Sequence, residues 1–297
     1  MFVVLMASFV ASWMLLLPDH FERFARSAMA QVGLVSNIFF RKQSRYFAPA
    51  AETMPLLHTW SLSVEEQFYV AFPIILFLAA RRSKISVVST ITVLLCASFA
   101  LNVYATYHNA AKAFFLLQSR AWELAVGALL AVTPASKVPR RGLMECASWA
   151  GIAAIIFPVV FYDSQTRFPG LAALLPCFGV FSFIWANHSA PTSAGKLLGM
   201  KPVVFVGLIS YSLYLWHWPL IVFAKYGGWG RWSWSQAFVA QKIFFLAVIV
   251  AISTASWRWI ETPFRRRNLF PDRKKIFFLA CGSCALVLAI GAIVREH

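Results

Sequence analysis

The sequence of 297 residues contains few charged side chains, and acidic ones are especially scarce. Only 13% of its residues are charged and 60% are hydrophobic, whereas soluble domains average about 25% charged and roughly 45–50% apolar residues. Such a composition excludes an ordinary soluble globule, because too little polar surface would face water. The sequence therefore predicts an integral membrane protein.

Several catalytic motifs are also missing. The chain contains no GxxxxGK[ST] loop for nucleotide hydrolysis, no HExxH zinc motif and no GxSxG nucleophile elbow. Its six histidines are scattered, so neither a metal site nor a bound cofactor is predicted. The five cysteines lie mostly in apolar segments, which argues against a disulfide framework.

Basic residues outnumber acidic ones, with 27 Lys and Arg against 11 Asp and Glu. In a soluble protein this excess would suggest nucleic acid, but here the basic residues form short clusters between apolar runs. That pattern is typical of loops on the cytoplasmic side of a membrane. We therefore expect membrane lipid and no nucleic acid as a partner, with basic loops that can attract a phosphate-rich cytosolic donor.

Nine apolar segments are predicted to cross the bilayer, since about 20 apolar residues span roughly 30 Å of hydrocarbon. A shorter segment with two arginines near its start, 23–40, is predicted to be an interfacial or re-entrant helix. Backbone amides at bilayer depth must bond internally, so the predicted fold class is all-α, a polytopic helical bundle. The nine segments are 1–17, 60–80, 86–106, 113–132, 143–162, 169–187, 203–225, 238–257 and 276–294.

The basic residues also predict the topology. Four loops that would share one side, 81–85, 133–142, 188–202 and 258–275, hold 15 Lys and Arg, against 5 in the opposite loops after residue 100. This bias places the four loops in the cytoplasm and the last residues outside. The 18–59 stretch is an exception, because it holds five basic residues on the predicted outer side.

The stretch LLHTWSLSVEEQFYVAFPIILF, residues 56–77, places ionisable groups at the mouth of a predicted span. Such groups face a bundle interior or a wet cavity and often mark function. We interpret His58, Glu65 and Glu66 as candidate catalytic residues that would share acid–base work on a hydroxyl. Alternatively, Glu65 pairs with Arg120 or a loop arginine and locks the bundle.

Further on, the stretch QSRAWELAVG places Arg120 and Glu123 three residues apart, so the two are predicted to form an ion pair on one helical face. A buried pair of this kind usually fixes geometry, which favours a role in shaping a site. The alternative is that Arg120 contacts an anionic substrate. Both residues are candidate substrate-binding residues.

Two later stretches complete the candidate substrate-binding set. In GLISYSLYLWHWPLIVF, His217 lies next to Trp216 and one turn after Tyr214. These residues predict a polar-aromatic patch, the kind of surface that commonly holds sugar rings, although a hydrogen-bonded packing histidine is equally compatible. In WRWIETPFRRR, Glu261 precedes a basic cluster, and most of this motif is typical of an interfacial anchor.

These four stretches occur in the order and at the spacing found in the acyltransferase-3 family, which the chain resembles over nearly its whole length. The family consists of bacterial integral membrane O-acyltransferases that modify O-antigen and other surface glycans. The resemblance implies transfer of an acyl group, often acetyl from acetyl-CoA, to a sugar hydroxyl at or outside the bacterial inner membrane. It implies acyl-CoA and a glycan acceptor as partners, while the acceptor, the acyl chain and the oligomeric state stay open.

The chain departs from the family pattern at its start. The resemblance implies that two further spans, carrying the family's catalytic histidine and a basic motif, precede the first span seen here. We therefore expect residues 1–275 to form the acyltransferase-3 transmembrane domain without those spans, and residues 276–297 to form a connecting span and extracytoplasmic end. On this hypothesis the chain by itself lacks acyltransferase activity.

Two other function classes are compatible with polar residues in the membrane. A multi-span transporter or flippase of a glycan or lipid intermediate would use them equally well, although no paired half-repeats with broken helices are found. A scaffold that binds the glycan machinery without turnover would follow from the missing spans. Acyl-CoA-dependent transfer of label separates the first class from an enzyme.

Overall fold

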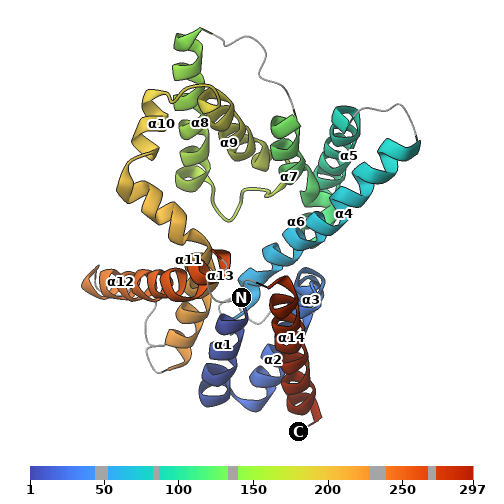
Figure 1. The fold of residues 1–297 in the computed structure, drawn as a ribbon, viewed down its shortest axis with the longest axis vertical. Helices are drawn as coiled ribbons and strands as arrows, with labels where there is room; N and C mark the ends of the chain where they lie inside the picture. Colours follow the sequence, from blue (N-terminus) through green and yellow to red (C-terminus); the bar gives the residue numbers. More distant parts are fainter. Residues whose placement is uncertain (44–52, 83–86, 133–139, 228–238, 267–271, 297) are drawn as a thin grey trace. The chain divides into compact units, whose positions relative to one another are not determined.

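A computed structural model describes residues 1–43, 53–82, 87–132, 140–227, 239–266 and 272–296 (Figure 1). Within these ranges the chain is helical and contains no strand. The α-helices are α1 (Phe2–Leu15), α2 (Pro18–Val32), α3 (Ser36–Gln43), α4 (Trp60–Arg82), α5 (Val87–His108), α6 (Ala110–Phe115), α7 (Leu117–Val132), α8 (Arg141–Phe161), α9 (Leu174–Asn187), α10 (Ser193–Leu198), α11 (Lys201–Tyr226), α12 (Val239–Ser256), α13 (Thr262–Arg265) and α14 (Arg273–Glu296). Two 3₁₀ turns, η2 (Leu57–Thr59) and η3 (Gly170–Ala173), and a π-helical turn, η5 (Trp257–Glu261), complete the described elements.

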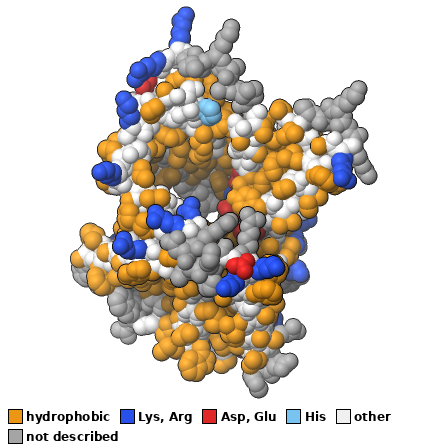
Figure 2. All heavy atoms as spheres, viewed as in Figure 1, with side chains coloured by type: hydrophobic (Ala, Val, Ile, Leu, Met, Phe, Trp, Pro, Cys, Tyr) orange, Lys and Arg blue, Asp and Glu red, His pale blue; other side chains and the backbone are white. Residues whose placement is uncertain are grey.

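Seven helical segments in the described ranges are long and apolar enough to cross a bilayer. Their outward side chains are hydrophobic, as at Val159, which is 82% exposed, and Phe278, which is 72% exposed. Figure 2 shows hydrophobic side chains over much of the drawn face, with Lys and Arg side chains in small groups. Water would solvate such surfaces poorly and lipid would cover them, so the predicted class of polytopic all-α membrane protein is confirmed.

The other two predicted spans are shorter helices. Helix α1 has 14 residues and α7 has 16, which correspond to about 21 and 24 Å at the usual rise per residue. The predicted span 113–132 divides because Leu116 adopts an extended conformation between α6 and α7. Similarly, the predicted helix over 23–40 divides into α2 and α3 at a bend where Leu34 has φ 57°.

The chain forms two compact units. Unit 1 comprises residues 1–63 and 205–297, and unit 2 comprises residues 64–204. In unit 1, α2 packs against α1, α3 and α14. The contact with α14 is close, because a Cβ atom added at Gly291 would lie 2.6 Å from the Cγ atom of Met29.

Unit 2 contains two tightly packed helix pairs, α5 with α7 and α8 with α9. Helices α8 and α9 cross at two glycines: a Cβ atom on Gly151 would lie only 2.7 Å from the carbonyl oxygen of Gly179. Small residues permit such close approach of membrane helices. Side-chain hydrogen bonds rather than glycines join α5 to α7, and these bonds belong to one of the two polar clusters described next.

Candidate functional site

The first polar cluster lies in unit 1 and comprises His58, Tyr214 and His217, hereafter the histidine cluster. The three rings contact one another edge-on or tilted, with centroids 5.3 Å apart for His58 and Tyr214 and 5.6 Å apart for each of the other two pairs. His58 belongs to η2, immediately before α4, and the other two residues lie one turn apart on α11. The structure therefore brings together three of the residues that the sequence marked as candidates.

Tyr214 fixes the backbone beside His58. Its hydroxyl donates a hydrogen bond to the carbonyl oxygen of His58, and the hydroxyl of Ser61 bonds to the same tyrosine oxygen. One helical turn along α11, the indole nitrogen of Trp218 donates to the carbonyl oxygen of Met54 at 2.9 Å. These bonds hold the 54–61 segment against α11, so the positions of the two histidines depend on each other.

The bonds of His217 determine its tautomer. Its Nδ1 atom lies 3.1 Å from the carbonyl oxygen of Leu213 and 2.8 Å from that of Tyr214. A carbonyl oxygen only accepts, so Nδ1 must carry the hydrogen. In neutral His217 the lone pair is therefore on Nε2, which is the nitrogen able to accept a hydrogen bond or a proton.

His58 is buried, with 8% of its surface exposed, and neither ring nitrogen forms a hydrogen bond of normal geometry with a described residue. Buried polar atoms in folded proteins nearly always have partners. An imidazole in this state retains unused capacity to donate and accept hydrogen bonds. The pair of histidines could bind a hydroxyl group directly.

Glu261 ends the π-helical turn η5 and faces α11. Its carboxylate accepts a hydrogen bond from Ser212 at 3.0 Å and pairs with Arg265 at 3.3 Å. Glu261 therefore forms an ion pair with an arginine of the basic cluster that follows it. The first contact joins the π-helical turn to the middle of α11, and the second joins it to the end of α13. Both contacts support an anchoring role for Glu261; its predicted role in substrate binding stays a prediction.

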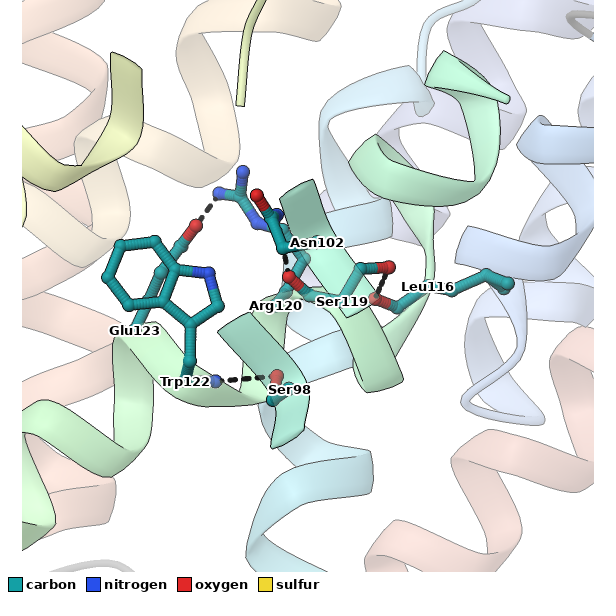
Figure 3. A network of polar contacts seen from close by, with 7 residues as sticks. All are labelled: Ser98, Asn102, Leu116, Ser119, Arg120, Trp122 and Glu123. Carbon is teal, nitrogen blue, oxygen red and sulfur yellow. Dashed lines mark hydrogen bonds and ion pairs between the residues drawn. The ribbon is translucent and has the colours of Figure 1, made fainter. Parts of the chain in front are cut away.

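The second polar cluster lies in unit 2 around Arg120 and Glu123, hereafter the charged cluster (Figure 3). Arg120 Nη2 lies 2.9 Å from Glu123 Oε2, and their side chains are only 17% and 20% exposed. The predicted ion pair is therefore confirmed. The guanidinium carbon also lies 5.9 Å from the ring centres of Phe114 and Phe168, a distance at which cation–π attraction operates.

Hydrogen bonds from α5 hold the charged cluster in place (Figure 3). The amide nitrogen of Asn102 donates to the carbonyl oxygen of Ser119 at 2.7 Å, and the hydroxyl of Ser98 accepts from the backbone N–H of Trp122 at 2.9 Å. Both α5 residues are buried. Sequence reasoning missed them, although two polar residues four apart within an apolar run were a visible signal.

Glu65 and Glu66, the two candidate catalytic carboxylates, lie on α4 in unit 2. Glu65 is partly buried and Glu66 is exposed, and neither forms a salt bridge with a described residue. Arg120 pairs with Glu123 instead, so the structure does not show the alternative lock between Glu65 and Arg120. The predicted catalytic role of the two glutamates, like that of His58, stays a prediction.

The remaining candidate, Trp216, lies next to His217 on α11, and its indole nitrogen is buried without a hydrogen-bond partner among the described residues. In the same ranges, no group of three or more His, Cys, Asp or Glu side chains has the arrangement of a metal site. The reactive groups of the two clusters are therefore imidazole, phenol, guanidinium and carboxylate groups.

The long apolar helices define a multi-pass helical membrane protein, and the two clusters place polar side chains within it. A family model described as an acyltransferase domain, acyltransferase-3, matches residues 2–258. The chain belongs to this family, and the predicted family and enzyme class, an acyltransferase, are confirmed.

Curated relatives agree with the family. The chain is 32% identical over 293 residues to the "Putative membrane-bound transacylase BcsY" of Komagataeibacter xylinus, covering 96% of this chain and 72% of the relative. It is 28% identical over 294 residues to the "O-acetyltransferase OatA" of Staphylococcus aureus (strain MRSA252), covering 93% of this chain and 48% of the relative. The chain thus spans about half the length of the second relative. No solved structure matches it.

Proposed function

We propose that the chain is part of a membrane O-acyltransferase that moves an acyl group, acetyl in the simplest case, from acyl-CoA to a hydroxyl of a cell-surface glycan such as O-antigen. Its location would be the bacterial inner membrane. The family membership supports acyl transfer, and the name of one relative describes an O-acetyltransferase. The cluster of basic residues near the end of α13 supports a phosphate-rich donor on one side of the membrane.

The observation that carries this proposal is the state of the two histidines. His217 presents the lone pair of Nε2, and His58 keeps both ring nitrogens without a normal hydrogen bond in the described structure. A glycan hydroxyl that enters this cluster can donate its hydrogen to one imidazole nitrogen. Withdrawing that hydrogen increases the electron density on the hydroxyl oxygen, which is the atom that must attack the acyl carbonyl carbon.

The reaction then needs no redox step. The hydroxyl oxygen forms a bond to the carbonyl carbon of the thioester, the bond from that carbon to sulfur breaks, and the CoA thiolate takes up the proton that the hydroxyl released. The aromatic side chains beside His217 supply flat apolar faces for a sugar ring. Tyr214 keeps the two imidazoles at a fixed separation by holding the backbone of His58.

The test uses the chain in membrane vesicles, supplied with acetyl-labelled acetyl-CoA and a cell-surface glycan. The proposal is supported if the glycan gains more acetyl label in vesicles that contain the chain than in vesicles that lack it. Such labelling would also overturn the hypothesis that the chain alone lacks turnover if the same activity survives purification. If the purified chain binds acetyl-CoA saturably but transfers no label, the result agrees with the proposed function and with the hypothesis that the chain alone lacks turnover.

The absence of both binding and transfer would contradict the proposed function. Movement of a glycan or lipid intermediate across liposomes without any CoA would instead indicate a transporter. Two variants sharpen the assay: His217→Ala should abolish transfer, whereas His108→Ala should not. The Nδ1 atom of His108 bonds to the carbonyl oxygen of Tyr104 at 2.8 Å in the same helical manner, but His108 is exposed and lies outside both clusters.

A further inference from the structure

An apolar groove of about 300 Å³ runs between α7 and α9 within unit 2. Helix α7 contributes Val126, Gly127 and Leu130 to its wall, and α9 contributes Val180, Phe181 and Ile184. The volume is at the lower end of the range that small-molecule pockets occupy. None of the roles proposed so far uses this groove.

A charged group closes one end of the groove. Glu123, one turn before Gly127 on the same face of α7, is the only acidic or basic residue among those that line the groove. Its Oε2 atom pairs with Arg120, whereas its Oε1 atom is buried and has no partner among the described residues. An unmet acceptor at the end of an apolar groove indicates a ligand with a polar head and an apolar tail.

The groove is open beside Gly127. A Cβ atom added there would meet no heavy atom within 4 Å. The absence of a side chain therefore leaves room at this point of the wall, between Glu123 and Leu130. A larger residue would fill that room without forcing the helix backbone to move.

We propose that this groove holds the acyl chain of the thioester donor, and that it admits chains longer than acetyl. The inference rests on the proposed function and specifies its donor. A water molecule occupies about 30 Å³ of liquid, so the groove offers room for about ten molecules of that size, and the two carbons of an acetyl group would leave most of it empty. A chain of six to eight carbons would follow α7 from Glu123 past Gly127.

The polar end distinguishes this occupant from a bilayer lipid tail. A thioester carbonyl can accept a hydrogen bond from the Arg120 guanidinium, and the amide N–H groups of the pantetheine arm can donate to Glu123 Oε1. The acyl tail of a bilayer phospholipid ends in an ester carbonyl, but it lacks the two amide N–H groups of the pantetheine arm. The donor therefore offers a polar partner to Glu123 Oε1 and an acyl chain to the apolar wall.

The test measures binding of CoA thioesters with two, four, six and eight acyl carbons to the chain in lipid nanodiscs. Each methylene that enters the groove should tighten binding about fourfold, until the groove is full. Gly127→Leu should remove this gain, weakening octanoyl-CoA binding at least tenfold while leaving acetyl-CoA binding within twofold of wild type. Gly127→Ala should give an intermediate result.

Gly282→Leu on α14 is the matched control, because a Cβ atom at Gly282 also meets no heavy atom within 4 Å and this helix belongs to unit 1. It should leave the chain-length series unchanged, and it corrects for partition of long acyl groups into the nanodisc lipid. Unfolding midpoints of all variants confirm that they fold. Affinity that does not depend on chain length, or an equal response of the two leucine variants, would overturn the inference. Acetyl transfer that persists in that case would leave the proposed function standing.

Discussion

The histidine cluster and the charged cluster use hydrogen bonds in different ways. In the histidine cluster, Tyr214 and Trp218 bond to backbone carbonyl oxygens, while nitrogens of the two imidazoles keep their capacity for a ligand. In the charged cluster, Arg120 pairs with Glu123 Oε2 and the polar side chains of α5 bond to the backbone of α7, while Glu123 Oε1 alone is left for the ligand proposed above.

This difference separates two tasks of buried polar groups in a membrane protein. Groups that satisfy one another join helices, because an unpaired polar group in hydrocarbon is costly. Groups with unmet capacity stabilise the fold less and bind ligands. Substitutions in the histidine cluster should therefore change acyl transfer more than stability, and substitutions in the charged cluster should change stability first.

The largest expected effect is that of His217→Ala. Loss of a group that accepts a proton or hydrogen bond from the reacting hydroxyl should lower the rate of label transfer by about 10²- to 10⁴-fold. Acceptor binding should weaken by about tenfold, the equivalent of one lost hydrogen bond. The midpoint of thermal unfolding should stay close to that of the wild type. A large fall in stability with an unchanged rate of transfer would show that the histidine cluster stabilises the fold and does not take part in transfer.

Arg120→Gln tests the charged cluster. The variant leaves the carboxylate of Glu123 in apolar surroundings and should lower the free energy of unfolding by about 2 kcal/mol, less than for a fully buried pair because both side chains are partly exposed. The double variant with Glu123→Gln should recover most of the loss. Arg265→Gln is the control, since this arginine is 70% exposed and its pair with Glu261 should contribute less than about 1 kcal/mol. A double variant no more stable than the single one would contradict the pairing.

Tyr214→Phe tests how the histidine cluster is held. The ring contacts remain, but the bonds to the carbonyl oxygen of His58 and to Ser61 are lost, at a cost of about 1 kcal/mol. Backbone amides in residues 57–61 should exchange hydrogen faster, as measured by mass spectrometry. Tyr69→Phe on α4, where the side chain is 59% exposed, should leave this exchange unchanged. Equal exchange in both variants would show that the tyrosine hydroxyl does not hold this segment.

The smallest effect concerns Asp163, in the connection between α8 and η3. Hydrogen bonds from the Thr166 side chain and from the backbone N–H groups of Gln165 and Thr166 lower the pKa of this carboxyl group. Its contribution to stability is therefore complete above the unfolded-state pKa, near 4, and is lost as the pH falls through the lower folded-state pKa. Asp163→Asn should reduce the dependence of the free energy of unfolding on pH below about pH 4. If that dependence is the same in the variant and the wild type, Asp163 does not have the lowered pKa.

The sequence predicts the long spans closely, because the length of an apolar run is a local property. The predicted span 203–225 corresponds to α11, Lys201–Tyr226, and the predicted span 86–106 to α5, Val87–His108. Hydropathy missed the break at Leu116, since leucine is apolar in either conformation. The ion pair of Arg120 and Glu123 was predictable because both residues lie on one helix.

The contact between His58 and Tyr214 could not be predicted in the same way. The two residues are 156 positions apart, and their contact depends on how the segment before α4 packs against α11. Each residue was marked singly, because it carries polar atoms into an apolar run. The tautomer of His217 depends on carbonyl oxygens of its own helix, so hydropathy contains no information about it.

The short length of α7 has a consequence for the surrounding lipid. The described part of α7 rises about 24 Å, less than the roughly 30 Å of hydrocarbon in a bilayer. A helix of this length is accommodated when the bilayer beside it thins or polar chain ends enter. Arg120 and Glu123 lie in the first two turns of α7 and would then be closer to the lipid headgroups than to the centre of the bilayer. Acyl transfer should accordingly depend on the thickness of the host membrane, and phospholipids with shorter tails should favour it.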